Sequence, residues 1–355
     1  MKTICYYVTG HGFGHSVRAS QVISQFPDDT RVIVRTSAPK HIYESEIARG
    51  FDFLPAEFDC GCLQKDSISV LRRETLARYR EIQERNHAGL AAEIEFLKSE
   101  KVDVVVSDIA PFPLYVAREA GLPGIALTNF TWHDIYAEYR ESASDDALLK
   151  QILSEYHCAT TALITPLSTP HVKDAFNICR DIPIVTRRGQ KLTAELHRQL
   201  GLSEGDLVAL VYFGVWGLDL DWKALEACGP WTFLCWGDPP GRPANVVSLD
   251  TLTLRNADIA ASVDVVVAKP GYGTVSQCIA DSVPLVYIHR SDFSEYDALV
   301  AGMEPWGGSV ELSLGDFAAG QWYTALEAAR SAKIDRDYYA VDGAAIAAKI
   351  IVEWN

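Results

Sequence analysis

The first 130 residues contain two kinds of hydrophobic pattern, short apolar runs and apolar residues at helical spacing, which follow each other in turn. Short apolar runs of strand length predict buried strands near residues 3–9, 30–36, 51–57, 102–107 and 124–128. Segments with apolar residues at helical spacing predict helices near residues 15–26, 39–49, 68–99 and 112–120. Such alternation of strand and helix builds a parallel sheet with helices on both faces.

The same alternation begins again in the second half of the chain. Strands are predicted at 207–213, 231–236, 264–268 and 284–288, with helices at 274–282 and, after Asp342, about 343–354. A stretch rich in Pro, Arg and Gly separates the halves. We therefore predict an N-terminal domain (1–165), an interdomain passage (166–190), a C-terminal domain (191–340) and a last helix (341–355) placed so that it can cross back to the first domain. The fold class is α/β: two Rossmann-like, doubly wound parallel-sheet domains that face a cleft.

Length, composition and charge limit the classes of function. A chain of 355 residues is long enough for two cores, and 48% hydrophobic with 22% charged residues is typical of a folded soluble protein. No apolar stretch reaches the 18 or so residues of a membrane span, and no signal-peptide core precedes Gly10, so we expect a cytoplasmic protein. The net charge of −15 argues against a nucleic-acid partner. The oligomeric state stays open.

Two histidines lie on a glycine-rich turn between the first strand and the first helix. The run is Gly10-His11-Gly12-Phe13-Gly14-His15. Glycines allow a ligand to approach the backbone, a helix start offers unpaired N–H groups, and an imidazole can take a proton near neutral pH. The structural alternative is a tight turn with a helix-capping side chain.

A second glycine-rich turn, Gly271-Tyr272-Gly273-Thr274, follows the strand 264–268. Its place before a helix suits phosphate oxygens, so we expect a diphosphate there. Alternatively, Thr274 and Gln277 form a capping box without any ligand. The cations near the predicted cleft edges, which would neutralise a diphosphate, are Arg187, Arg188, Lys269 and Arg290.

Asp108 ends the strand 102–107 at the same sheet edge as the first glycine-rich turn. A carboxylate beside His15 would fix one imidazole tautomer and make that ring a general base for a hydroxyl proton. The structural alternative is that Asp108 caps the helix that begins near Pro111. Asn129 and Trp132 lie in an aromatic run after the next strand, where rings either stack on sugars or fill the core.

The cysteines give little support for a metal site. The eight are scattered, and the single close pair, Cys60-Gly61-Cys62, has neither a second pair nor neighbouring histidines. We predict no metal and no bound cofactor.

Several segments together resemble a known family, the glycosyltransferases with the GT-B fold, and within it the N-terminal, glycosyltransferase-like region of plant L-arabinokinases. The likeness runs almost end to end, although the sugar-kinase part of those enzymes has no counterpart here. The segments that carry it are 6–15, 59–61, 105–108, 128–132, 135–139 and 271–276.

The resemblance implies a function and a set of site residues. The C-terminal domain would bind a nucleotide-diphosphate-sugar donor and the N-terminal domain a small-molecule acceptor, without a metal, and His15 would be the base of an inverting transfer with Asp108 as its partner. Gln277 stands where many members have a glutamate that binds the ribose, which departs from the family pattern. The expected donor-binding residues are Gly214, Gly271, Gly273, Thr274, Gln277, Arg188, Arg290 and Glu295. The expected acceptor-side residues are His11, Gly12, Gly14, Asn129 and Trp132.

Two other functions remain open at this point. The chain is either a glycosyltransferase, a catalytically silent module that senses a nucleotide-sugar, or a nucleotide-sugar epimerase. Binding without turnover would mark the silent module, and consumption of donor without an acceptor would mark the epimerase. No pair of carboxylates at one sheet edge suits a retaining glycosidase.

Overall fold

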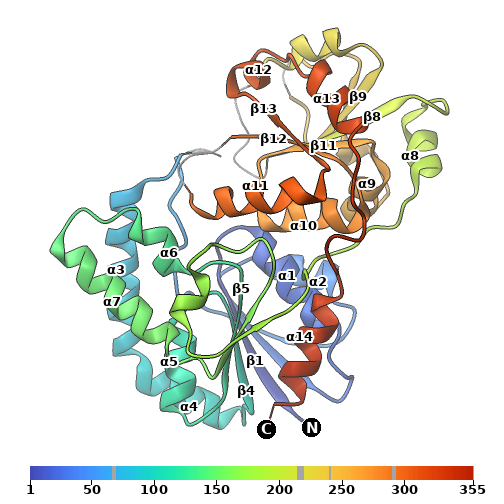
Figure 1. Cartoon of the computed structure of the whole chain (residues 1–355). Helices are drawn as coiled ribbons and strands as arrows, with labels where there is room; N and C mark the ends of the chain where they lie inside the picture. The colour runs from blue at the N-terminus through green and yellow to red at the C-terminus, as the bar shows by residue number, and fades with distance from the viewer. Residues whose placement is uncertain (66–68, 214–219, 240, 290–292, 355) are drawn as a thin grey trace.

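The computed structural model describes residues 1–65, 69–213, 220–239, 241–289 and 293–354. The chain forms two α/β domains, each built on a parallel sheet, as the alternating pattern predicts. Figure 1 shows the two domains one above the other, with both termini on the N-terminal domain.

The N-terminal sheet has seven strands in the order β3-β2-β1-β4-β5-β6-β7. Its strands are β1 (Thr3–Val8), β2 (Arg31–Thr36), β3 (Asp52–Pro55), β4 (Val104–Asp108), β5 (Gly124–Thr128), β6 (Thr161–Ile164) and β7 (Cys179–Asp181). The helices are α1 (Phe13–Ile23), α2 (Lys40–Glu46), α3 (Arg72–Ala88), α4 (Leu90–Ser99), α5 (Phe112–Glu119), α6 (Trp132–Ala137) and α7 (Ala143–Tyr156).

Strand β1 shows why both faces of this sheet are apolar. Ile4, Tyr6 and Val8 pack into the core beneath α1, whereas Cys5 and Tyr7 point into the opposite core. Successive side chains of a strand leave opposite faces, so a strand covered on both sides reads as one continuous apolar run. The carboxyl end of β1 is thereby fixed at the sheet edge that faces the second domain.

The sequence prediction is wrong for two N-terminal segments, and it has no counterpart of helices α6 and α7. The single helix expected at 68–99 is two helices, because Gly89 ends α3 and begins α4. Glycine is a poor residue for a helix interior, and the amphipathic pattern continues across the break, which hid it. Strand β7 lies inside the expected passage 166–190 and forms the edge of the N-terminal sheet, paired with β6.

The C-terminal sheet has six parallel strands in the order β10-β9-β8-β11-β12-β13. The strands are β8 (Leu207–Tyr212), β9 (Trp231–Cys235), β10 (Val246–Ser248), β11 (Val265–Ala268), β12 (Leu285–Ile288) and β13 (Ser309–Leu312). The helices of the second half are α8 (Thr193–Leu200), α9 (Asn256–Ser262), α10 (Tyr272–Asp281), α11 (Glu295–Trp306), α12 (Leu314–Ala318), α13 (Tyr323–Arg330) and α14 (Gly343–Val352).

The chain crosses between the domains twice, and the two crossings lie side by side. The Ile184 N–H donates to the Ala340 carbonyl at 3.0 Å, and the Gly343 N–H donates to the Ile184 carbonyl at 3.1 Å. The second crossing ends in α14, which packs on the N-terminal domain through Ala347, Ala348 and Ile351. Figure 1 shows α14 (red) on the N-terminal domain, where it packs against α1. The last helix therefore completes the core of the first domain.

This packing makes the last helix a stability element of the first domain. Ile351 is fully buried against the β1–α1 core, so Ile351→Ala should lower the free energy of unfolding by about 2–5 kcal/mol through lost burial and the cavity it leaves. Denaturant unfolding measures the change. Lys349→Ala, an exposed substitution on the same helix, is the control, and equal unfolding midpoints for the two variants would contradict this packing.

Candidate active site

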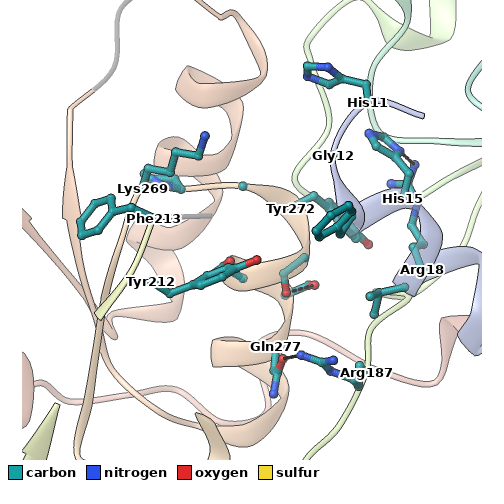
Figure 2. A pocket seen from close by; sticks show the side chains of 18 of the residues that line it. His11, Gly12, His15, Arg18, Arg187, Tyr212, Phe213, Lys269, Tyr272 and Gln277 are labelled. Atoms are coloured by element: carbon teal, nitrogen blue, oxygen red, sulfur yellow. Dashed lines mark hydrogen bonds between the residues drawn. The ribbon is translucent and has the colours of Figure 1, made fainter. Parts of the chain in front are cut away.

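A cleft of about 1370 Å³ lies between the domains. The carboxyl ends of the parallel strands face it, the usual position for ligands in open α/β sheets. Its N-terminal wall includes both histidines of the first glycine-rich turn, and its C-terminal wall includes the second turn with Tyr212, Phe213 and Lys269. Figure 2 shows these walls opposite each other. The volume exceeds that of most single-ligand pockets and suits two ligands bound together.

The turn after β1 brings His15 to the cleft. Gly12 has a φ of 72°, a conformation that side chains disfavour, and α1 begins directly after it. The turn is anchored by Thr9, whose hydroxyl donates to the buried Asp59 at 2.6 Å. His15 stands in the first turn of α1 with its side chain 11% exposed.

His15 forms a short contact with Asp108, as predicted from their sheet-edge positions. The His15 Nδ1 lies 2.8 Å from Asp108 Oδ1, and Asp108 is fully buried at the end of β4. An ionised carboxylate oxygen can only accept, so Nδ1 is the donor in this contact, and Arg18 Nη2 lies 3.2 Å from the same nitrogen. Asp108 is not a helix cap, since the N-cap of α5 is Pro111, without a side-chain hydrogen bond.

Arg18 is a member of this site that the sequence prediction did not include. Its Nε donates to Asp108 Oδ2 at 2.8 Å and its Nη2 to Asp108 Oδ1 at 2.6 Å, and the guanidinium is 2% exposed. Burial alone would raise the pKa of Asp108, but the Arg18 charge and the hydrogen bonds from Arg18 and His15 outweigh it and lower that pKa. The carboxylate therefore stays ionised. The only signal in the sequence is a charged residue three positions after His15 on the inward face of α1.

Trp132 lies behind His11 in the N-terminal wall of the cleft. Trp132 is fully buried, donates its Nε1–H to Asp59 Oδ2 at 3.1 Å and does not line the cleft. His11 does line the cleft and packs edge-on against the Trp132 ring, with centroids 5.4 Å apart. Burial raises the pKa of Asp59, which the hydrogen bonds from Thr9 and Trp132 partly offset. Trp132 thus supports the wall, whereas His11 forms it.

The second glycine-rich turn faces the first across the cleft. The N-cap residue of α10 is Gly271, and Thr274 lies inside the helix. Thr274 and Gln277 therefore do not form the alternative capping box. A Cβ added to Gly273 would lie 3.4 Å from the Gly14 Cα, which shows how closely the starts of α1 and α10 approach. The positive ends of two helix dipoles meet here, at a place suited to an anion.

Gln277 and the neighbouring arginines differ in part from the expected donor site. Gln277 Oε1 accepts from Arg187 Nη2 at 3.1 Å (Figure 2), and its Nε2 donates to the Ala257 carbonyl at 3.2 Å. Arg187 lines the cleft, and its Nη1 forms an ion pair with Glu46 Oε1, in α2 of the N-terminal domain, at 2.7 Å. Arg188 instead donates to the Ala280 carbonyl and does not line the cleft. Of the two neighbouring arginines, Arg187 therefore lines the cleft and Arg188 does not. The other two expected donor-site residues, Gly214 and Arg290, lie outside the described residues.

Asn129 and Glu295 link the two walls. Asn129 is fully buried behind the cleft, and its Nδ2 donates to Glu295 Oε1 at 2.8 Å. Glu295 is the first residue of α11 and lines the cleft, as do Gly12, Gly14, Gly271, Gly273 and Thr274. The structure therefore brings most of the expected residues to one cleft and places Asp108, Asn129 and Trp132 directly behind its surface.

The described residues contain no group of three His, Cys, Asp or Glu side chains arranged to hold a metal ion. Cys60 and Cys62 line the cleft. Burial raises the pKa of Cys60 to about 12, so it stays a neutral thiol. Across the described ranges, no helix is long and apolar enough to cross a membrane.

Comparison with known proteins defines the class of this fold. The glycosyltransferase of kitacinnamycin aligns over 99% of this chain and 98% of its own, with a TM-score of 0.66 and 16% identity. Arabidopsis thaliana UGT89C1, solved with quercetin, aligns over 99% and 94% (TM-score 0.61, 14% identity). Acinetobacter baumannii MurG aligns over the full length of both chains (TM-score 0.57, 14% identity). The architecture is the two-domain GT-B fold.

Sequence comparison leads to the family. Residues 2–177 match the family described as glycosyl transferase family 1. An L-arabinokinase of Arabidopsis thaliana is 34% identical over 98% of this chain, which spans about a third of that relative's length (34%). The N-terminal half of the chain thus matches a glycosyltransferase family model, and the whole chain has the GT-B fold.

The Arg18–Asp108 pair gives a stability prediction. Arg18→Met would leave a buried carboxylate without its counter-charge, so the free energy of unfolding should fall by about 3–5 kcal/mol. Arg118→Met, which breaks the exposed pair with Glu119, should cost under about 1 kcal/mol. Denaturant titration measures both variants, and similar losses would show that Asp108 does not depend on Arg18.

Proposed function

We propose that this protein transfers a sugar from a nucleotide-diphosphate donor to a hydroxyl of a small acceptor, with inversion and without a metal. The observation that carries the proposal is His15: an imidazole whose Nδ1 contacts the ionised Asp108 carboxylate at 2.8 Å, in the first turn of α1 where it lines the cleft. The match of residues 2–177 to glycosyl transferase family 1 supports sugar transfer in general. The geometry supports a proton acceptor opposite an anion site.

The proposed reaction is a single displacement. His15 Nε2 takes the proton of the acceptor hydroxyl while that oxygen forms a bond to the anomeric carbon of the donor. The bond from this carbon to the diphosphate oxygen breaks, and its electron pair leaves with the nucleoside diphosphate. The start of α10 at Gly271–Thr274 receives the departing charge where it develops. Attack opposite to the leaving group inverts the anomeric centre.

The lining of the acceptor side supports an acceptor with an apolar face. Leu63, Leu71 and Phe130 line the cleft on the His15 side. A structural neighbour, Phytolacca americana UGT2, was solved with UDP-2-fluoroglucose and pterostilbene, a small acceptor-sized molecule beside a nucleotide-sugar (TM-score 0.62, 12% identity). We propose an acceptor of that size for this chain.

One observation favours a second candidate, a module that binds a nucleotide-sugar without transfer. Gln277 stands where the family resemblance implies a ribose-binding glutamate, and its oxygen is already engaged by Arg187. A donor would therefore meet fewer acceptor groups at its ribose. This alternative predicts ligand binding with no turnover.

Substitution of His15 separates the two candidates. His15→Ala should lower kcat by about 10²–10⁴-fold, the usual contribution of a general base, with donor affinity unchanged. His171→Ala, at a 79% exposed histidine, is the control. Steady-state transfer assays and calorimetry of donor binding give the two readouts. Equal turnover of His15→Ala and wild type would reject His15 as the base.

The donor class can be found by thermal stability. A nucleoside diphosphate at about 100 times its Kd should add about 2.7 kcal/mol of stability to the wild type. Gly273→Leu should abolish the shift, because a Cβ at Gly273 already lies 3.4 Å from the Gly14 Cα and the rest of a leucine side chain would crowd the cleft at this turn. Gly50→Leu is the control for the loss of glycine, because Gly50 is exposed, has open space at its Cβ position and does not line the cleft. A shift that persists in Gly273→Leu would contradict a diphosphate site at this turn.

A further inference from the structure

Arg18 makes more contacts than stabilisation of Asp108 requires. While Nε and Nη2 bind the two Asp108 oxygens, Nη1 donates to Asn129 Oδ1 at 2.7 Å. The guanidinium carbon also lies 4.9 Å from the centroid of the Tyr272 ring, at the start of α10. One buried cation therefore touches the carboxylate of the base, a buried amide and the opposite domain. A lysine, with a single nitrogen, cannot make this set of contacts.

Asn129 carries the connection across the cleft. Its side-chain oxygen accepts from Arg18 and its side-chain nitrogen donates to Glu295, so both ends of the amide are used. The amide orientation follows from these partners, because Arg18 can only donate and the Glu295 carboxylate can only accept. The result is an unbroken series of polar contacts: His15, Asp108, Arg18, Asn129 and Glu295. Four members belong to the N-terminal domain and the last begins α11 of the C-terminal domain.

We propose that Arg18 is a positioning residue that aligns His15 with the donor side of the cleft, acting through Asp108 on one side and through Asn129 and Glu295 on the other. The inference rests on the proposed transfer reaction for its kinetic consequence. The base is then fully ordered only when Glu295 is in place, so that closure of the two walls and alignment of the base occur together. Neither Arg18 nor Asn129 has to touch the reacting atoms.

A single isosteric substitution breaks the hydrogen bond between Asn129 and Glu295, which joins the two domains. Asn129→Asp still accepts from Arg18 but cannot donate to Glu295, and it places two carboxylates against each other. Adding Glu295→Gln supplies a new amide that can donate to the new carboxylate, so the double variant restores the contact with reversed polarity. Asn86→Asp is the matched control, since Asn86 is a buried asparagine whose amide donates to the Phe58 carbonyl at 2.9 Å outside the cleft.

Two readouts separate positioning from a general loss of structure. The first is the side-chain ¹⁵N signals of His15, followed against pH without any ligand. The charged groups that face His15 are Asp108 from β4, Arg18 from α1 and the buried Asp59 after β3. The second readout is kcat and KM for transfer from the donor identified by thermal stability.

We expect Asn129→Asp and Arg18→Lys to change the His15 signals and their pH dependence and to lower kcat on the order of 10–100-fold, with the acceptor KM little changed. The double variant Asn129→Asp/Glu295→Gln should return the His15 signals and kcat most of the way to their wild-type values. Asn86→Asp should leave the His15 signals unchanged. Wild-type His15 signals and kcat in both Asn129→Asp and Arg18→Lys would overturn the inference, as would a double variant that recovers neither readout.

The two proposals fail in different ways. A wild type that transfers no sugar, but whose His15 signals respond to Asn129→Asp and recover with Glu295→Gln, rejects the transferase and supports the positioning role of Arg18. The opposite result is a wild type that transfers sugar through His15, but whose His15 signals and kcat are unchanged in Asn129→Asp and Arg18→Lys. It supports the transferase and rejects the positioning role.

Discussion

A buried ion pair between Arg18 and Asp108 is the constraint on which the candidate site depends. Asp108 has no exposed surface, so its charge is tolerated only because the Arg18 fork satisfies both oxygens. Such a pair adds little net stability compared with an apolar core, but it fixes geometry. Here it holds Asp108 against His15 Nδ1, and Arg18 is joined through Asn129 to Glu295 of the opposite domain.

The backbone supplies the second half of the site. Two parallel sheets direct their carboxyl ends at one cleft, and the helices that follow β1 and β11 meet there at Gly14 and Gly273. A Cβ at Gly273 would lie 3.4 Å from the Gly14 Cα, so the two turns approach to van der Waals contact. The polar series holds His15 on one wall of the cleft, and the turn at Gly273 places the positive end of α10 on the other.

Much of this arrangement could be predicted from the sequence, because it depends on local signals. Apolar runs give the strands, and the glycine-rich turns after β1 and β11 give the place of the chemistry. The contact of His15 with Asp108 follows from the rule that parallel strands end at one edge. The break at Gly89 and the short edge strand β7 could not be predicted, because the amphipathic pattern runs through the first and the second has only three residues.

The missing parts of the site depend on tertiary contacts. Arg18 looks like an ordinary helix charge until α1 is packed against β4 and β5, and the choice of Arg187 over Arg188 depends on which side chain faces the cleft. Trp132 carries the aromatic signal of a sugar platform, but its indole is used to hold Asp59. Sequence patterns indicate which helix or strand a residue belongs to, whereas the direction in which its side chain points depends on how the elements pack.

A crystal structure of the protein with a nucleoside diphosphate and the glycosylated product would test the proposed chemistry best. We predict that the glycosidic oxygen lies about 2.6–3.2 Å from His15 Nε2 and that the diphosphate lies at the start of α10. A glycosidic oxygen far from His15, or a diphosphate bound away from Gly271–Thr274, would contradict the proposal that His15 is the base and that this cleft is the site of transfer.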